Sequence, residues 1–186
     1  IRRQQLDSII KDLEVLNMLN TKYIIYNESQ PPLHNENRLG PAWLVNDYRL
    51  VPDAMAEIQA LNDFSPAKTA IIDQDFKDRI HLNEISRDTS GYIRLTHYEP
   101  NHLKYDYQAS GTQLVVFSEI YYPKGWKLFI DGEQADLFRA NYILRAATIP
   151  EGKHEIEMKF EPKSYYLGNK ISGYSSIILL IFGGLT

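Results

Sequence analysis

The sequence predicts a mainly β fold: an antiparallel β-sandwich or jelly-roll-like domain with an N-terminal amphipathic helix and a truncated C-terminal apolar segment of the transmembrane type. Apolar residues at helical spacing occur near the start of the chain, and from Tyr92 a period of two persists for almost seventy residues. After Lys170, sixteen positions carry no charge. The first pattern is typical of a helix with one buried face, and the second of strands with one wet face.

The N-terminal helix is predicted from Gln4 to Leu19. Its apolar stripe consists of Leu6, Ile9, Ile10, Leu13 and Leu16. The short β-branched and aromatic run from Lys22 to Tyr26 then predicts a buried strand. Asn27 to Pro41 is rich in Pro and Asn, which disfavour regular structure, so we expect an ordered loop or an exposed connection there.

Three short elements are predicted in the middle of the chain. Ala42 to Val45 reads as a strand that Tyr48 to Val51 continues after a turn. The apolar spacing from Asp53 to Leu61 fits a short helix, and Ala70 to Ile72 is a weak strand. The polar stretch from Asp73 to Gly91 is expected to cover the surface.

The second half of the chain predicts the sheets. Leu103 to Ala109 alternates between apolar and polar residues, whereas Leu114 to Phe117 is apolar throughout and is placed centrally, buried on both sides. Asp131-Gly132 follows the strand Trp126 to Ile130 and predicts a type I′ hairpin turn.

The last strand of this half is the clearest in its alternation. Lys153 to Phe160 has one apolar and one charged face, and it is expected to pair with Tyr142 to Ile149 across Pro150-Glu151-Gly152.

These elements define the predicted organisation. Residues 1–170 form a single α+β region, with a helix, strand and loop-rich part at 1–91 and an antiparallel β part at 92–165. Residues 171–186 are interpreted as the start of a transmembrane helix, because a span needs roughly 20 apolar residues and this tail would supply the first two-thirds.

Composition excludes several classes of function. The 20 Lys and Arg residues against 24 Asp and Glu residues give a net charge of −4 without a basic run, so we expect no nucleic-acid partner. The absence of Cys excludes disulfides, thiolate chemistry and Cys-ligated zinc. No nucleophile elbow, phosphate loop or HExxH motif occurs, and no catalytic residue is assigned.

The best candidate for ligand binding is a cluster of aromatic and polar side chains that suits sugars, because rings stack on sugar C–H faces and guanidinium groups bind hydroxyls or anions. Its members are Tyr121, Tyr122, Trp126, Arg139, Asn141, Tyr142 and Arg145. The alternative is structural: Trp126 turns inward as a core residue, and Arg139 and Arg145 form ion pairs.

Two other constellations are weaker. His34 with Glu36, and His97 and Glu99 with His102, contain metal-ligand residue types, but their spacing matches no defined site, so we expect no metal and no cofactor. Glu119 and Asp131 could serve glycoside hydrolysis only if the fold brought them to a suitable separation.

Several motifs carry a family resemblance. Phe117-Ser-Glu-Ile-Tyr-Tyr-Pro-Lys-Gly-Trp126, Ile130-Asp-Gly132, Arg139-Ala-Asn-Tyr-Ile-Leu-Arg145, Gly152-Lys-His154 and Phe160-Glu-Pro162 resemble the C-terminal region of the YfhO-like family of bacterial polytopic membrane proteins. Leu16 to Ile25 resembles the start of that region. The residues from Asn35 to Trp43 are similar to those of family members from Bacteroidetes.

The resemblance implies an extracytoplasmic domain, beside the last spans of an inner-membrane protein related to glycosyltransferases that use lipid-linked sugars. The catalytic carboxylates of such a protein are expected in an earlier extracytoplasmic loop. The implied partners are the remainder of the parent protein, the membrane through the C-terminal segment, and a cell-envelope glycan.

The leading hypothesis is therefore a non-catalytic domain that positions an acceptor glycan or caps the membrane part. The alternative is a structural or protein-interaction domain that binds no sugar. An exposed aromatic groove at Trp126 would favour the first, and complete burial of Trp126 the second.

Overall fold

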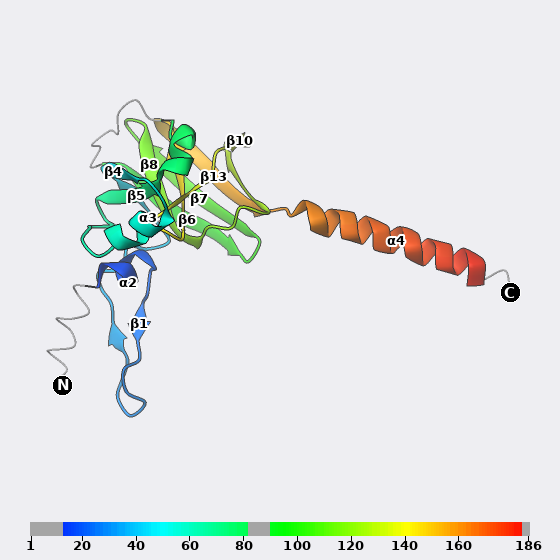
Figure 1. The fold of residues 1–186 in the computed structure, drawn as a ribbon, viewed down its shortest axis with the longest axis horizontal. Coiled ribbons are helices and arrows are strands. Elements are labelled where there is room, and N and C mark those ends of the chain that lie inside the picture. The colour runs from blue at the N-terminus through cyan, green and yellow to red at the C-terminus, as the bar shows by residue number, and fades with distance from the viewer. Residues whose placement is uncertain (1–12, 82–89, 184–186) are drawn as a thin grey trace.

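The computed structural model describes residues 13–81 and 90–183 and shows a β domain from which a hairpin and a long helix project (Figure 1). Most strands lie in two antiparallel sheets, so the predicted mainly β, antiparallel character is confirmed. Side chains from both sheets meet in one hydrophobic core. The sandwich or jelly-roll assignment stays a prediction.

The five-stranded sheet has the order β10-β9-β13-β7-β6. Its strands are β6 (Tyr92–Glu99), β7 (His102–Ala109), β9 (Trp126–Ile130), β10 (Glu133–Ala135) and β13 (Gly152–Phe160). Along β7, Leu103, Tyr105 and Tyr107 are buried, and the residues between them are partly or fully exposed. The sheet therefore has one dry face and one wet face.

The four-stranded sheet has the order β11-β12-β8-β3 and is covered on both faces. Its strands are β3 (Ala42–Val45), β8 (Gln113–Ile120), β11 (Phe138–Ala140) and β12 (Leu144–Ile149). On β8, Val115 and Phe117 pack in the core shared with the five-stranded sheet, while Leu114 and Val116 pack in a second core. The predicted central position of this strand is confirmed.

A third layer covers the outer side of the four-stranded sheet. It contains α2 (Glu14–Met18), β4 (Asp47–Val51), α3 (Ala54–Ala60), β5 (Thr69–Asp73) and the 3₁₀ helix η1 (Gln74–Arg79). The Asp53 side chain caps α3 by accepting a hydrogen bond from the backbone N–H of Ala56 at 2.8 Å. β4 does not continue β3 as predicted, because it pairs in parallel with β5.

The N-terminal helix is described only as α2. The predicted positions 4–12 lie outside the described residues, and the last turn ends at Met18, which is buried against the four-stranded sheet.

The prediction of a buried strand from Lys22 to Tyr26 is wrong. Residues 20–40 form a hairpin, here called the finger, in which β1 (Tyr23–Ile24) pairs only with β2 (Leu33–His34). The finger projects from the domain (Figure 1), and β1 is largely exposed, whereas Leu33 of β2 is buried. Tyr23 is consequently 54% exposed and Ile25 76% exposed.

The predicted pairing of β12 with β13 is also wrong. β12 pairs with β8 and β11, β13 pairs with β7 and β9, and Pro150-Glu151 carries the chain from one sheet to the other. The reason is burial: β12 is apolar enough to be covered on both faces, whereas β13 alternates and needs one wet face.

The β9–β10 hairpin turn is of the predicted kind. Asp131 has a φ of +52° and Gly132 a φ of +87°, and both are required by a type I′ turn.

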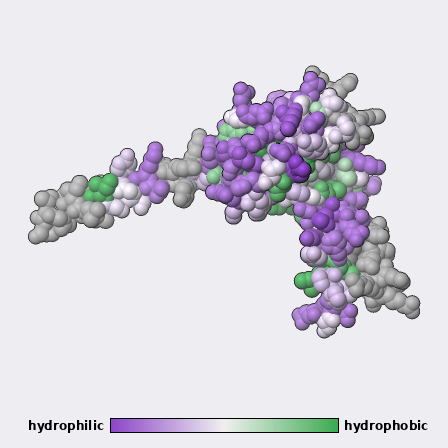
Figure 2. All heavy atoms as spheres, turned by 180° about the vertical axis from the view of Figure 1, so that it is seen from behind, coloured by the Kyte–Doolittle hydropathy of each residue, from purple (hydrophilic) through white to green (hydrophobic). Residues whose placement is uncertain are grey.

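The described part of the chain ends in α4 (Lys163–Gly183), which extends away from the β domain (Figure 1). The C-terminal segment is helical as expected, but the helix begins at Lys163, earlier than predicted. Hydrophilic residues dominate the visible β domain in Figure 2, whereas α4 carries exposed Ile171, Tyr174 and Ile177. Among the helices of residues 13–81 and 90–183, none is long and apolar enough to cross a membrane.

Candidate functional site

A pocket lies where β9 begins, β13 ends and α4 starts. Its volume is about 650 Å³. Its lining residues are Tyr122, Pro123, Lys124, Gly125, Trp126, Lys127, Phe160, Glu161, Pro162 and Ser164. We call it the aromatic pocket, because three rings with cationic and anionic side chains at their edges make up much of its wall.

The register of β13 against β9 brings the rings together. Phe160 is the direct partner of Trp126, and the two ring centroids lie 5.3 Å apart. The Tyr122 ring lies 6.3 Å from Phe160 and is 49% exposed, whereas Trp126 is partly buried against the core. The pocket therefore offers one exposed ring and two rings that are anchored in the fold.

Gly125 lets the loop approach Phe160. Its φ is +131°, and a Cβ at this position would lie 2.7 Å from a ring carbon of Phe160. The carbonyl of Gly125 accepts a hydrogen bond from the N–H of Glu161 at 2.7 Å, and Lys127 pairs with the Glu161 carboxylate at 2.8 Å. These contacts fix Gly125 and Lys127 to the connection between β13 and α4.

Arg145 lies beneath the pocket instead of in it. The guanidinium is 3.9 Å from the Trp126 ring centroid, and Nε donates to the carbonyl of Ile120 at 3.0 Å. The residue is only 3% exposed, and within the described part of the chain it forms no ion pair with a carboxylate. Arg145 thus supports the indole by a cation–π contact.

The surroundings of Arg145 shift three pKa values. Burial lowers the pKa of Arg145 itself, an effect that the charge of Glu119 opposes. Burial raises the pKa of Glu119, which Arg145 partly offsets, and burial raises the pKa of Tyr105. The cause is the low dielectric of the core shared by the two sheets.

Arg139, Asn141 and Tyr142 form a second cluster with its own side-chain partners, although Arg139 lies directly opposite Arg145 in the pairing of β11 with β12. Arg139 pairs with Glu57 at 2.8 Å and with Asp73 at 3.0 Å, so the structural ion pair considered for this residue is present. The backbone N–H of Tyr142 donates to the other Glu57 oxygen at 2.8 Å. Burial raises the pKa of Glu57, and the Tyr142 N–H and Arg139 oppose that rise.

The turn between β11 and β12 explains why this cluster is structural. Asn141 and Tyr142 have φ values of +50° and +72°, and the Asn141 side chain accepts a hydrogen bond from the N–H of Ile71 at 2.8 Å. Asn141 is fully buried. The cluster therefore joins the four-stranded sheet to β5 and α3.

Tyr121 lies between the two clusters. Its N–H donates to the carbonyl of Ile143, and its ring meets Phe76 edge-on at 5.7 Å. It lines a smaller cavity of about 160 Å³ behind Trp126.

The remaining candidates are dispersed. Glu119 lies beside Arg145 near the start of β9, while Asp131 follows the end of β9 and bonds His154 at 2.6 Å, so these carboxylates have different partners. His34 lies on the finger against Tyr23.

Sequence reasoning missed Phe160, Lys127 and Glu161 as pocket residues. Phe160 and Glu161 stand far from Trp126 along the chain, and the pairing of β13 with β9 brings them to the pocket, whereas Lys127 follows Trp126 on β9.

Comparison with known proteins gives a match that includes the aromatic pocket. Residues 81–172 match the family model described as bacterial membrane protein YfhO. We call this matched stretch the YfhO region. The YfhO region contains the whole aromatic pocket, and the finger, β4 and β5 precede it. No curated protein and no solved structure matches the chain.

Proposed function

We propose that the YfhO region is a non-catalytic, extracytoplasmic domain of a polytopic inner-membrane protein related to lipid-linked-sugar glycosyltransferases. In this proposal the aromatic pocket positions an acceptor glycan of the cell envelope. Residues 171–186 contact the membrane beside it. The match to the YfhO family model supports the membrane setting.

The observation that carries the proposal is the position of the aromatic pocket at the first turn of α4. Tyr122 offers an exposed ring to a sugar face, and Lys124 and Lys127 provide donors at the edge. A glycan held there would lie at the junction between the β domain and the C-terminal helix. Because the pocket is shallow and partly polar, the affinity should be weak.

Titration of the chain with glycans, followed by NMR, tests this proposal. The probes are a neutral hexose oligosaccharide, an N-acetylhexosamine oligosaccharide and a hexose phosphate. We expect shifts at the Trp126 indole for at least one probe and their loss in Tyr122→Ala. Tyr98→Ala, which removes a ring that is 63% exposed outside the pocket, is the matched control and should leave the shifts unchanged.

A structural or protein-interaction role without sugar binding is the second candidate. It is favoured by the burial of Arg145 and Asn141 and by the engagement of Arg139, since these side chains are committed to the fold. Unchanged spectra with all three probes would favour this role and would contradict the glycan proposal.

A further inference from the structure

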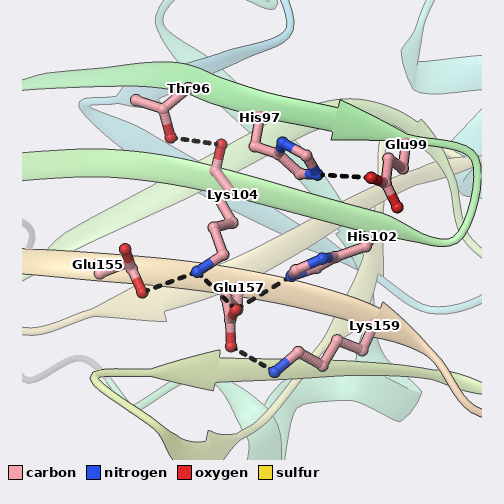
Figure 3. Close-up of polar contacts among 8 residues, drawn as sticks. All are labelled: Thr96, His97, Glu99, His102, Lys104, Glu155, Glu157 and Lys159. Atoms are coloured by element: carbon pink, nitrogen blue, oxygen red, sulfur yellow. Dashed lines mark hydrogen bonds and ion pairs between the residues drawn. The ribbon is translucent and has the colours of Figure 1, made fainter.

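The wet face of the five-stranded sheet carries a second polar site, whose residues do not line the aromatic pocket. It lies on the β6–β7 hairpin and the neighbouring strand β13 (Figure 3). Its central side chains are His97 and Glu99 on β6 and His102 on β7. A donor atom from each of these three residues lies within 4.8 Å of the others.

A β-bulge creates this arrangement. Leu95 pairs with the inward-facing Tyr105, whereas His97 pairs with the outward-facing Lys104, so one extra residue, Thr96, interrupts the register. The Thr96 hydroxyl donates to the Lys104 carbonyl at 3.2 Å. Without the bulge, strict alternation would place His97 on the core face with Leu95.

The register after the bulge completes the triad. Glu99 lies directly opposite His102, and His97 is two positions along the same face of β6. The rings of His97 and His102 are 5.3 Å apart between centroids. Spacing along the chain could not show this, because His102 meets His97 and Glu99 only through the hairpin pairing.

We propose that His97, Glu99 and His102 form a binding site for a divalent transition metal of the zinc type. Zinc binds imidazole nitrogen and carboxylate oxygen at about 2.0 to 2.2 Å, which places tetrahedral donors roughly 3.3 Å apart. His97 Nε2 and Glu99 Oε1 already lie 3.3 Å apart. The donor atoms of all three residues lie within 4.8 Å of one another, and metal binding would require the His102 ring to move closer to the other two.

Glu157 acts as an orienting residue for this site. Its Oε1 lies 3.0 Å from His102 Nε2, which leaves Nδ1 of that ring to bind the metal. A carboxylate that holds the far nitrogen of a metal-binding imidazole fixes the ring and increases its basicity. Glu157 is itself held by Lys104 at 2.9 Å and by Lys159 at 2.6 Å, as Figure 3 shows.

The charges around the triad permit a cation. Lys104 and Lys159 both pair with Glu157, so the positive charge nearest the triad is matched by this carboxylate. The His97 and Glu99 side chains are 42% and 57% exposed, which leaves the remaining coordination position open to water or to a group from a partner. Two imidazoles and one carboxylate favour zinc over calcium or magnesium, which prefer oxygen ligands alone.

Calorimetric titration of the whole chain with zinc chloride, in a non-chelating buffer with mild detergent, tests the site. We expect one zinc ion per chain and a loss of affinity of about tenfold or more in His97→Gln, His102→Gln and Glu99→Gln. His81→Gln is the matched control, because His81 is exposed and pairs with Asp136 on another part of the surface. It should bind zinc like the unaltered chain.

A second measurement separates a built site from scattered histidine binding. In ¹⁵N spectra of the imidazoles, zinc should shift His97 and His102 first among the five histidines of the chain, and Glu157→Gln should weaken binding without abolishing it. Absence of zinc binding would overturn the proposal. Equal shifts at His34, His81 or His154 would overturn it as well.

Discussion

At the scale of single residues, Gly132 shows how one backbone angle controls a hairpin. Its φ is +87°, and a Cβ there would meet no atom within 4 Å, so any penalty for a side chain comes from the backbone. Gly132→Val should lower the free energy of unfolding by about 1 to 2 kcal/mol. Urea denaturation measures it, with Gly168→Ala, a helical glycine with open space, as the control. Unaltered stability would contradict the I′ turn.

Asp131 of the same turn pairs with His154 on β13, and this pair should make the free energy of unfolding depend on pH. Burial opposes the charge on His154, but hydrogen bonds to Asp131 and to the Glu151 carbonyl raise its pKa. The bond to His154 and the N–H of Glu155 lower the pKa of Asp131. The contribution of His154 to the free energy of unfolding is therefore complete below its unfolded pKa near 6.5. It is lost as pH rises through the folded pKa.

The contribution of Asp131 to the free energy of unfolding is lost only at acid pH, as pH falls below the ordinary aspartate pKa of 3.8 and through the lower folded pKa. The free energy of unfolding should thus decrease between about pH 6 and pH 8 by less than about 1 kcal/mol, because the pair is partly exposed. His154→Gln should remove this component in urea titrations at both pH values. A variant with the full pH dependence would exclude the pair as its source.

At the scale of elements, α4 contributes little to the β domain. It extends from the end of β13, and Ile171, Tyr174 and Ile177 are more than half exposed. Removal of residues 174–186 should change the melting temperature very little and should improve solubility, because it removes exposed apolar surface. Differential scanning calorimetry and gel filtration provide the measurements. A large loss of stability would show that the tail packs on the domain.

The elements also show which structural features the residue pattern within one segment can predict. The capped helix α3, the central strand β8 and the β9–β10 turn were predictable, because spacing within one segment determines each of them. The exposed finger was not, since a β-branched run has the same composition whether or not a second layer covers it.

At the scale of the whole molecule, Arg139 joins the layers. It links β11 to Glu57 on α3 and to Asp73 on β5, and Glu57 is fully buried. Arg139→Met should therefore cost about 3 kcal/mol or more, because it leaves a buried carboxylate without its cation. Arg94→Met, which removes an exposed arginine paired with Asp106, is the control and should cost less than about 0.5 kcal/mol.

Equilibrium unfolding in guanidinium chloride compares the two arginine variants. A second change, Glu57→Gln in the Arg139→Met background, should recover part of the loss, because it removes the uncompensated charge. Equal stability of Arg139→Met and Arg94→Met would contradict the role of Arg139 in joining the layers.

The sequence by itself determined the β class, the alternation of β7 and β13, and the similarity to a membrane-protein family, because these features depend on residues close together along the chain. It also identified Tyr122 and Trp126 as neighbours, since only three residues separate them.

Only the tertiary structure decided which side chains meet. The pairing of β13 with β9 joined Phe160 to Trp126, and the bulge at Thr96 turned His97 toward Glu99 and His102. Arg139 and Arg145 are paired between β11 and β12, yet Arg139 binds Glu57 and Asp73 while Arg145 packs on Trp126. The physical reason is that strand register and layer coverage minimise exposed apolar area over the whole chain, and local spacing does not contain that information.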